Sequence, residues 1–192
     1  MLRRLYDWTI SMADHPAALW VLFAVAFVES SIFPIPPDVL LIPMIIARPK
    51  SAFWIATVCM VGSVLGGIAG YAIGAFAFDS IGRPVLEALG KADYFDQFAT
   101  NYNEWGIWVV LTAGVTPFPY KVITILSGAT QLPLGVFIVT SIIARSIRFF
   151  AIGALLYYFG QPIRDFIERR LGLVFTAFVI LLVGSFAALR YL

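Results

Sequence analysis

Two long hydrophobic regions of the chain are interrupted at matching positions by prolines that stand beside charged residues. The first interruption runs from Glu29 to Asp38, and the second runs from Thr112 to Lys121. The prolines that mark them are Pro34, Pro36, Pro37, Pro117 and Pro119. When Asp38 is aligned with Lys121, two prolines of one segment fall on two of the other, and a long hydrophobic run follows each segment. The chain is therefore predicted to contain a duplicated membrane unit.

Each interrupted region is predicted to form a re-entrant hairpin, over residues 17–47 and 105–131. Proline lacks the backbone donor and blocks helix continuation, so each region should consist of two half-helices joined by irregular backbone. The second arm of the first hairpin, residues 39–47, is too short at 1.5 Å per residue to cross about 30 Å of hydrocarbon. Paired broken helices at corresponding positions of two halves are typical of a transport site near the bilayer midplane.

The fold class predicted from this pattern is an all-α integral membrane protein, with a single membrane domain over residues 1–192. It combines an inverted repeat of two re-entrant hairpins with three transmembrane helices and an N-terminal interfacial helix. Uninterrupted hydrophobic runs predict the spans, and the charged segment between them predicts a connector at the membrane surface. Outside the hairpins, the predicted elements are an interfacial helix at 1–15, transmembrane helices at 51–78 and 133–159, a surface connector at 79–104, and a turn with a C-terminal transmembrane helix at 162–192.

Composition places the chain outside the range of soluble domains. Hydrophobic residues make up 61% of the sequence and charged residues 12%, with a mean hydropathy of +0.92. The formal net charge of +2 is small and the basic residues are scattered, so nucleic-acid binding is not expected. If the hairpins return to their starting side, most basic residues lie on the side of the N-terminus, which is then cytoplasmic by the positive-inside rule. Hairpins that span the membrane would give the same ratio of basic residues on the two sides, so the case for re-entrance depends on the prolines and the charges.

Charged residues also stand where lipid is expected. Arg145 and Arg148 lie near the middle of the second predicted long helix, and their spacing places both on one face. A charge at the bilayer centre costs at least about 2.5 kcal/mol, so each arginine must face a partner or water. The hairpin residues Glu29, Asp38 and Lys121 are the candidate partners. One interpretation is a purely structural ion-pair network; the other is a substrate and proton site, in which the one surplus positive charge binds an anionic group such as a lipid phosphate.

Four glycines recur every four residues along the first long helix and therefore share one face. Small residues at this spacing are typical of close helix packing in membranes, and we favour this interpretation over a path for lipid. The four residues are Gly62, Gly66, Gly70 and Gly74.

The chain carries no motif of an enzyme or of a cofactor site. With a single cysteine, Cys59, and a single histidine, His15, it has no metal-ligand spacing. It also lacks a nucleophile motif, a phosphate loop and a dinucleotide-binding motif. We therefore expect no catalytic residue, no cofactor and no metal, and a protein that is not an enzyme.

Three segments together resemble the DedA family, whose shared region is called the VTT or SNARE-associated Golgi protein domain. They are the segment from Glu29 to Asp38, the glycine-rich run from Gly66 to Gly74, and the segment from Thr116 to Lys121 that leads to Ser127-Gly128-Ala. The resemblance covers about residues 20–160. It implies multi-pass proteins of the bacterial inner membrane, with two facing re-entrant hairpins, that are associated with moving lipids between leaflets and often depend on the proton motive force. Eukaryotic relatives are lipid scramblases.

By this resemblance, the two acids of the first hairpin occupy the positions of the family's essential acids. The second hairpin departs from the family's arginine pattern, because Gly114 and Tyr120 stand where many members have arginine and Lys121 follows one place later. The departure resembles a divergent, YqaA-like branch of the family. The two arginines of the second long helix are candidates to supply the missing positive charge.

The leading hypothesis is a flippase or scramblase that moves an anionic lipid, such as a polyprenyl phosphate or a phospholipid, between leaflets. The hairpin tips would meet near the midplane, the three basic groups would hold the head group, and Glu29 and Asp38 would couple its release to protonation. Two alternatives stay open: a proton-coupled antiporter for cations or drugs, and an envelope-assembly factor without transport. The expected partners are membrane lipids and protons, with a second copy of the chain if the protein forms a homo-oligomer.

Overall fold

The computed structural model describes residues 17–32, 36–116 and 118–169, and every regular element in these ranges is helical. The all-α fold class predicted from the sequence is therefore confirmed. The predicted interfacial helix, most of the predicted C-terminal transmembrane helix, and the tip prolines Pro34 and Pro117 lie outside the described residues.

The first half of the chain forms a helical hairpin followed by a long helix. α2 (Ala18–Ser31) ends just before the first proline segment, and α3 (Asp38–Ala47) begins directly after it. A short 3₁₀ turn, η1 (Pro49–Ser51), leads into α4 (Ala52–Ala77). The prolines explain where α3 and η1 begin, because a fixed φ suits the first turn of a helix.

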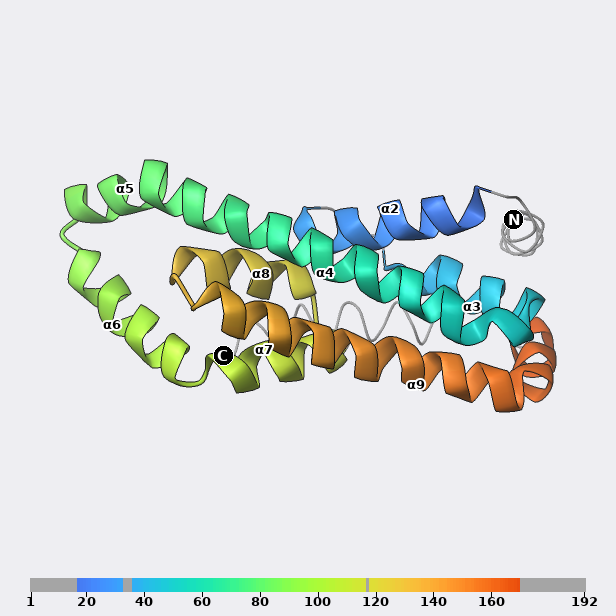
Figure 1. Ribbon diagram of the computed structural model, residues 1–192. Coiled ribbons are helices and arrows are strands. Elements are labelled where there is room, and N and C mark those ends of the chain that lie inside the picture. The colour runs from blue at the N-terminus through green and yellow to red at the C-terminus, as the bar shows by residue number, and fades with distance from the viewer. Residues whose placement is uncertain (1–16, 33–35, 117, 170–192) are drawn as a thin grey trace.

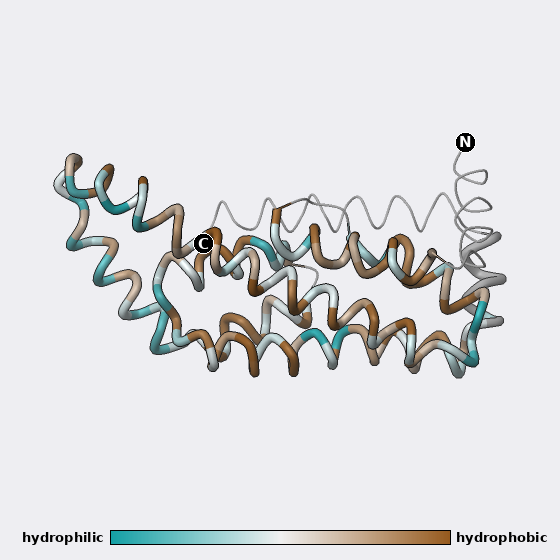
Figure 2. Tube along the Cα trace, turned by 45° about the horizontal axis from the view of Figure 1, so that its top comes forward, coloured by the Kyte–Doolittle hydropathy of each residue, from teal (hydrophilic) through white to brown (hydrophobic). Residues whose placement is uncertain are grey.

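An arm then separates the two halves. It consists of the π-helical turn η2 (Phe78–Gly82), α5 (Arg83–Ala88) and α6 (Ala92–Glu104), and it extends away from the rest of the bundle (Figure 1). Figure 2 shows that hydrophilic residues are frequent along this arm, whereas hydrophobic colours dominate the bundle.

The second half repeats the order of the first. α7 (Gly106–Val115) and α8 (Tyr120–Ala129) form the second hairpin, and α9 (Leu134–Arg169) is the long helix, with a kink at Phe159. Thr116, which follows α7, has the extended backbone expected of a residue before proline.

The two hairpins enter the molecule from opposite ends. In Figure 1, α4 and α9 run side by side along the molecule, the α2–α3 hairpin begins and ends at one end, and the α7–α8 hairpin begins and ends at the other. The hairpin arms α2, α3, α7 and α8 contain 14, 10, 10 and 10 residues. At 1.5 Å per residue, none of them reaches about 30 Å. The tips therefore face each other in the middle of the molecule.

The packing between the halves is crosswise. The first arms pack on the long helix of their own half, α2 on α4 and α7 on α9, whereas the second arms pack on the opposite long helix, α3 on α9 and α8 on α4. Two hydrophobic clusters result, one that includes Leu22, Ile45 and Phe149 and one that includes Val110 and Phe137. On α9, residues 139–148 separate the two clusters, and this is the level at which the hairpin tips meet.

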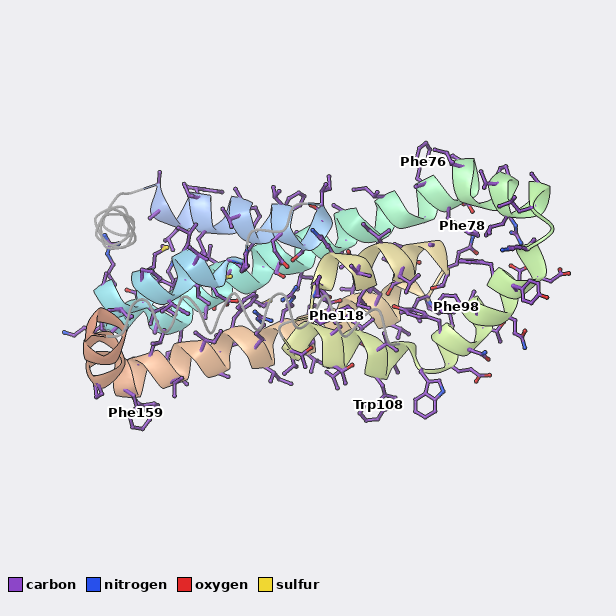
Figure 3. All side chains as sticks on the ribbon, turned by 180° about the vertical axis from the view of Figure 1, so that it is seen from behind. Phe76, Phe78, Phe98, Trp108, Phe118 and Phe159 are labelled. Carbon is purple, nitrogen blue, oxygen red and sulfur yellow. The ribbon has the colours of Figure 1, made fainter. Side chains whose placement is uncertain are left out.

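Two described helical runs are long and apolar enough to cross a membrane, namely Pro49–Ala88 and Leu134–Gly160. Many large hydrophobic side chains on the outside of the bundle are exposed, as expected where lipid replaces water. Figure 3 shows Trp108 and Phe159 projecting outward from the bundle. The exposed aromatic residues that the sequence suggests as interfacial anchors are Trp20, Trp54, Trp105, Trp108, Tyr157 and Tyr158.

Candidate functional site

The two hairpin tips are joined by contacts between residues far apart in the sequence. The Lys121 ammonium donates to the backbone carbonyl of Ile32 at 3.5 Å, and the Thr124 hydroxyl donates to the carbonyl of Ser30 at 3.0 Å. Figure 3 shows Phe118, from the second tip, in the middle of the molecule. The beginning of α8 is thus fixed to the end of α2.

Arg148 connects both hairpins to α9. Its Nη2 donates to Asp38 Oδ2 at 2.5 Å, and its Nη1 donates to the backbone carbonyl of Thr116 at 2.5 Å. Asp38 is the first residue of α3, where the helix dipole favours a carboxylate. Short charge-assisted hydrogen bonds are among the stronger ones in proteins. One guanidinium group therefore holds the beginning of α3 and the end of α7.

A second ion pair lies deeper and is looser. Arg145 Nη2 is 3.5 Å from Glu29 Oε2, and the two side chains are 2% and 14% exposed. Glu29 Oε2 also accepts a hydrogen bond from the Ser30 hydroxyl at 3.0 Å, and Ser30 contacts the Ser63 hydroxyl at 2.7 Å. α2, α4 and α9 all contribute polar groups to this pair.

Tyr120 forms a platform for Arg145. The Cζ of Arg145 lies 3.7 Å from the centroid of the Tyr120 ring, and the Phe149 ring is 5.7 Å away. The Tyr120 hydroxyl donates to the Ser141 hydroxyl, one turn before Arg145 on α9, at 2.5 Å. A desolvated cation over an aromatic ring is stabilised by about 2 kcal/mol.

Several buried polar atoms of this layer have no hydrogen-bond partner within the part of the chain that the structure describes. They are Arg145 Nε and Nη2, Arg148 Nε and Asp38 Oδ1. A buried group left without its hydrogen bond costs about 1–3 kcal/mol, and more if it is charged. Orphaned atoms concentrated in one layer make this layer the candidate functional site.

The structure pairs four of the five predicted substrate and proton residues at the level of the hairpin tips, and Lys121 contacts the end of α2 through the carbonyl of Ile32. Glu29 pairs with Arg145, and Asp38 pairs with Arg148. Within the described ranges, Lys121 forms no salt bridge, and its printed partner is a carbonyl oxygen. The layer thus holds two acid–base pairs and one further cation.

The predicted glycine face receives backbone from both halves. A Cβ atom on Gly62 would lie 2.6 Å from the carbonyl oxygen of Phe23 in α2, and one on Gly66 would collide with the carbonyl of Phe27. Further along α4, a Cβ on Gly74 would collide with the carbonyl of Ile125 in α8. Gly70 lies between, against Thr124 and Ser30.

The hairpin prolines Pro36, Pro37 and Pro119 directly precede α3 and α8.

The small polar residues that surround the ion pairs were not predicted as part of the site. Thr124, Ser30 and Ser63 are buried, and so are Ser141 and the Tyr120 ring. Two of them carried a readable signal, because Ser141 lies four residues before Arg145 on the same helix face and Ser63 follows Gly62. Across the described ranges, no group of three His, Cys, Asp or Glu side chains is placed to hold a metal ion.

Comparison with known proteins decides the family. The profile of the VTT domain matches residues 35–161, a range that contains α3 through most of α9 and four of the five charged residues of the layer. The chain belongs to the VTT domain family. Proteins of the VTT, or DedA, family are membrane proteins that are generally linked to membrane transport or lipid flipping.

The VTT protein described here has relatives along almost its whole length. An uncharacterized protein of Haemophilus influenzae is 34% identical over 186 residues, covering 97% of this chain and 96% of that protein. An uncharacterized protein of Histophilus somni is 36% identical over 186 residues, covering 97% of each chain. No solved structure matches.

Proposed function

We propose that this VTT protein is a flippase or scramblase that moves an anionic lipid between the leaflets of the bacterial inner membrane, with its N-terminus in the cytoplasm. The observation that carries the proposal is the charged layer in the middle of the bundle, where Arg145 is 2% exposed and two of its nitrogen atoms have no hydrogen bond to any described residue. Ionisable groups inside a membrane protein are costly and mark substrate or ion pathways. The family link to membrane transport supports the same conclusion.

In this proposal both hairpins are re-entrant and form an inverted repeat. Their short arms and opposite entry points support this arrangement. Irregular backbone at membrane depth is tolerated where protein buries it, and the four arms that lead to the tips pack on α4 and α9. The crosswise packing would let one half rock against the other around the charged layer.

A phosphate head group fits the chemistry of the layer. The positive N-terminal ends of α3 and α8 both reach it, and the dipole of such an end favours an anion. Lys121 supplies a cation that has no carboxylate partner among the described residues, and the two arginines supply further donors. Protonation of Glu29 would free Arg145 for the phosphate, which links lipid movement to protons.

A cation antiporter is less compatible with these contacts. Each acid already faces an arginine, so a metal ion or cationic drug would enter a layer whose formal charge is positive. Cation uptake would therefore have to displace an arginine from a buried pair, which costs about 3–5 kcal/mol per broken pair.

Lipid exchange in proteoliposomes tests the proposal. Vesicles that contain the full chain should exchange a fluorescent phospholipid or a polyprenyl phosphate between leaflets, and Arg145→Ala and Glu29→Gln should each slow this exchange at least about tenfold. Asp93→Asn on the exposed side of α6 is the matched control and should exchange lipid as the wild type does. An absence of exchange by the wild type, or unaltered exchange in both layer variants, would contradict the proposal. Intact cellular complementation by the layer variants would instead favour the envelope-assembly role.

A further inference from the structure

The two arginines of the charged layer differ in what their guanidinium groups contact. We propose that an oxyanion of the lipid head group binds the Nε–Nη2 edge of Arg145, that Glu29 is the counter-ion it displaces, and that Arg148 is a clamp between the hairpin tips. This inference rests on the proposed function and deepens it, because it assigns substrate binding to one arginine of the layer.

The open edge of Arg145 carries the inference. Nε and Nη2 lie on the same side of a guanidinium group, and together they form the edge that binds two oxygens of a phosphate or carboxylate. Both atoms are buried, and neither has a hydrogen-bond partner within the described residues. The nearest acid, Glu29, is 3.5 Å from Nη2, too far for a charge-assisted hydrogen bond of about 2.8 Å. A buried edge of this kind matches the geometry of a bidentate oxyanion.

Glu29 is suited to leave this edge. Its Oε2 also accepts a hydrogen bond from Ser30, which is itself in contact with Ser63, so the carboxylate keeps polar partners when it separates from Arg145. The pair is thus held at a distance at which Coulomb attraction remains but no directional bond has to be broken. A head-group phosphate would replace the Coulomb attraction between Glu29 and Arg145 with two hydrogen bonds from Nε and Nη2 of Arg145.

Arg148 has a different set of contacts. Both of its terminal nitrogens are engaged, one by Asp38 at the beginning of α3 and one by the Thr116 carbonyl at the end of α7. An oxyanion could bind its terminal groups only if it released one hairpin tip. The geometry therefore gives Arg148 the role of fixing the two tips, because it holds the beginning of α3 and the end of α7.

Tyr120 is a positioning residue in this arrangement. Its ring lies under the Arg145 guanidinium at 3.7 Å, and its hydroxyl is tied to Ser141 on the same helix as Arg145. The ring therefore covers one face of the guanidinium and leaves the edge available. Lysine at position 145 would keep the charge but lose both the planar edge and the stacking.

Thermal unfolding of the purified full chain in detergent provides the test. The probe is dihexanoyl phosphatidic acid, and dihexanoylglycerol is its uncharged counterpart. Glu29→Gln should lower the unfolding midpoint, because Arg145 loses its carboxylate, and the probe should raise the midpoint further than it does in the wild type. The affinity for the probe should increase about tenfold, which corresponds to about 1.4 kcal/mol.

Asp38→Asn is the matched control, since it removes the same charge from the neighbouring pair. It should also lower the midpoint, but the probe should stabilise it no more than the wild type. Equal rescue of Asp38→Asn and Glu29→Gln would overturn the division of roles, and so would the absence of rescue in Glu29→Gln. Arg145→Lys should bind the probe about tenfold more weakly, and Tyr120→Leu should lose more affinity than Tyr120→Phe, which keeps the ring.

Two further outcomes separate the inference from the proposed function. Rescue by inorganic phosphate as strong as rescue by the lipid phosphate would overturn a lipid head group as the ligand. Lipid exchange by the wild type together with equal rescue of the two variants would refute the inference and leave the proposed function standing. The expected rescue pattern without any lipid exchange would refute the proposed function and leave an anion site at Arg145.

Discussion

The two hairpins meet at one level of the molecule, but they bring opposite chemistry to it. The first hairpin contributes both acids of the layer, Glu29 at the end of α2 and Asp38 at the beginning of α3. The second hairpin has no acid between Gly106 and Ala129, and it contributes Lys121, the ring of Tyr120 and a backbone carbonyl. The long helices differ as well, since α4 is uncharged and glycine-rich whereas α9 places Arg145 and Arg148 at the level of the layer.

The difference shows that the duplicated backbone carries a divided set of charges. All the acids of the layer lie in the first half and all its bases lie in the second. Both buried ion pairs therefore connect the first hairpin to α9, across the boundary between the halves. Attraction between unlike charges therefore adds to the close helix packing between the halves, because the hydrophobic effect is weak between helices in lipid.

The largest loss of stability is expected when the Asp38–Arg148 ion pair, which joins the two halves, is broken. Arg148→Met should lower the free energy of unfolding by about 3–5 kcal/mol, because Asp38 is then buried without a partner. Asp38→Asn together with Arg148→Met should cost less than the sum of the two single changes. Denaturant titration in detergent measures all three variants, and additive losses would mean that the pair does not hold the halves together.

The next largest loss of stability is expected at the glycine face of α4, and it tests close backbone packing between the halves independently of charge. Gly74→Ala should lower the free energy of unfolding by about 1–3 kcal/mol, because the added methyl group meets the Ile125 carbonyl in α8. Gly66→Ala tests the corresponding contact with Phe27 in the first half. Gly67→Ala is the matched control on the same helix, since its methyl group finds side-chain atoms at 3.4 Å or beyond, an ordinary contact distance. Unfolding titrations that showed equal losses at positions 67 and 74 would contradict this account.

The fold was predictable where the sequence interrupts its own hydrophobic pattern. Prolines beside charges predicted two broken hairpins, and the structure has helix ends on either side of both proline segments. The crosswise packing was not predictable, because a repeat of hydrophobic arms contains no information on which long helix each arm contacts. Likewise, the four-residue glycine spacing predicted a face for close packing, but not that α2 and α8 would share it.

The charged residues of the site were predictable from the sequence, but the partners in each ion pair were not. Five ionisable residues within hydrophobic surroundings stood out from the sequence because such groups are rare in membranes. Which acid faces which arginine depends on the rotation of α9, which no spacing reveals. Tyr120 was visible only as a replaced arginine, and its stacking on Arg145 needed coordinates.

A smaller effect is expected at the neutral contact between the tips. Thr124→Val removes the hydroxyl that donates to the Ser30 carbonyl and should lower the free energy of unfolding by about 1 kcal/mol. Thr112→Val is the control, since the Thr112 hydroxyl is exposed and bonds only to carbonyls of its own helix. The same titration should show a clear loss for the first variant and a smaller one for the second. A reversed order would show that the Thr124 contact does not join the halves.

The smallest loss of stability is expected in the arm, where the charged side chains are exposed and do not join the two halves. Arg83 lies 3.3 Å from Asp96 and 3.7 Å from Glu87, with side chains 47%, 56% and 61% exposed. Exposed pairs of this kind contribute about 0–1 kcal/mol, so Arg83→Gln should change the free energy of unfolding by less than about 0.5 kcal/mol. That small change should disappear at 1 M salt, where the screening length is about 3 Å, whereas the loss in Arg148→Met should persist. The salt dependence of these losses in unfolding free energy would thus show which ion pairs hold the two halves together and which contribute little to stability.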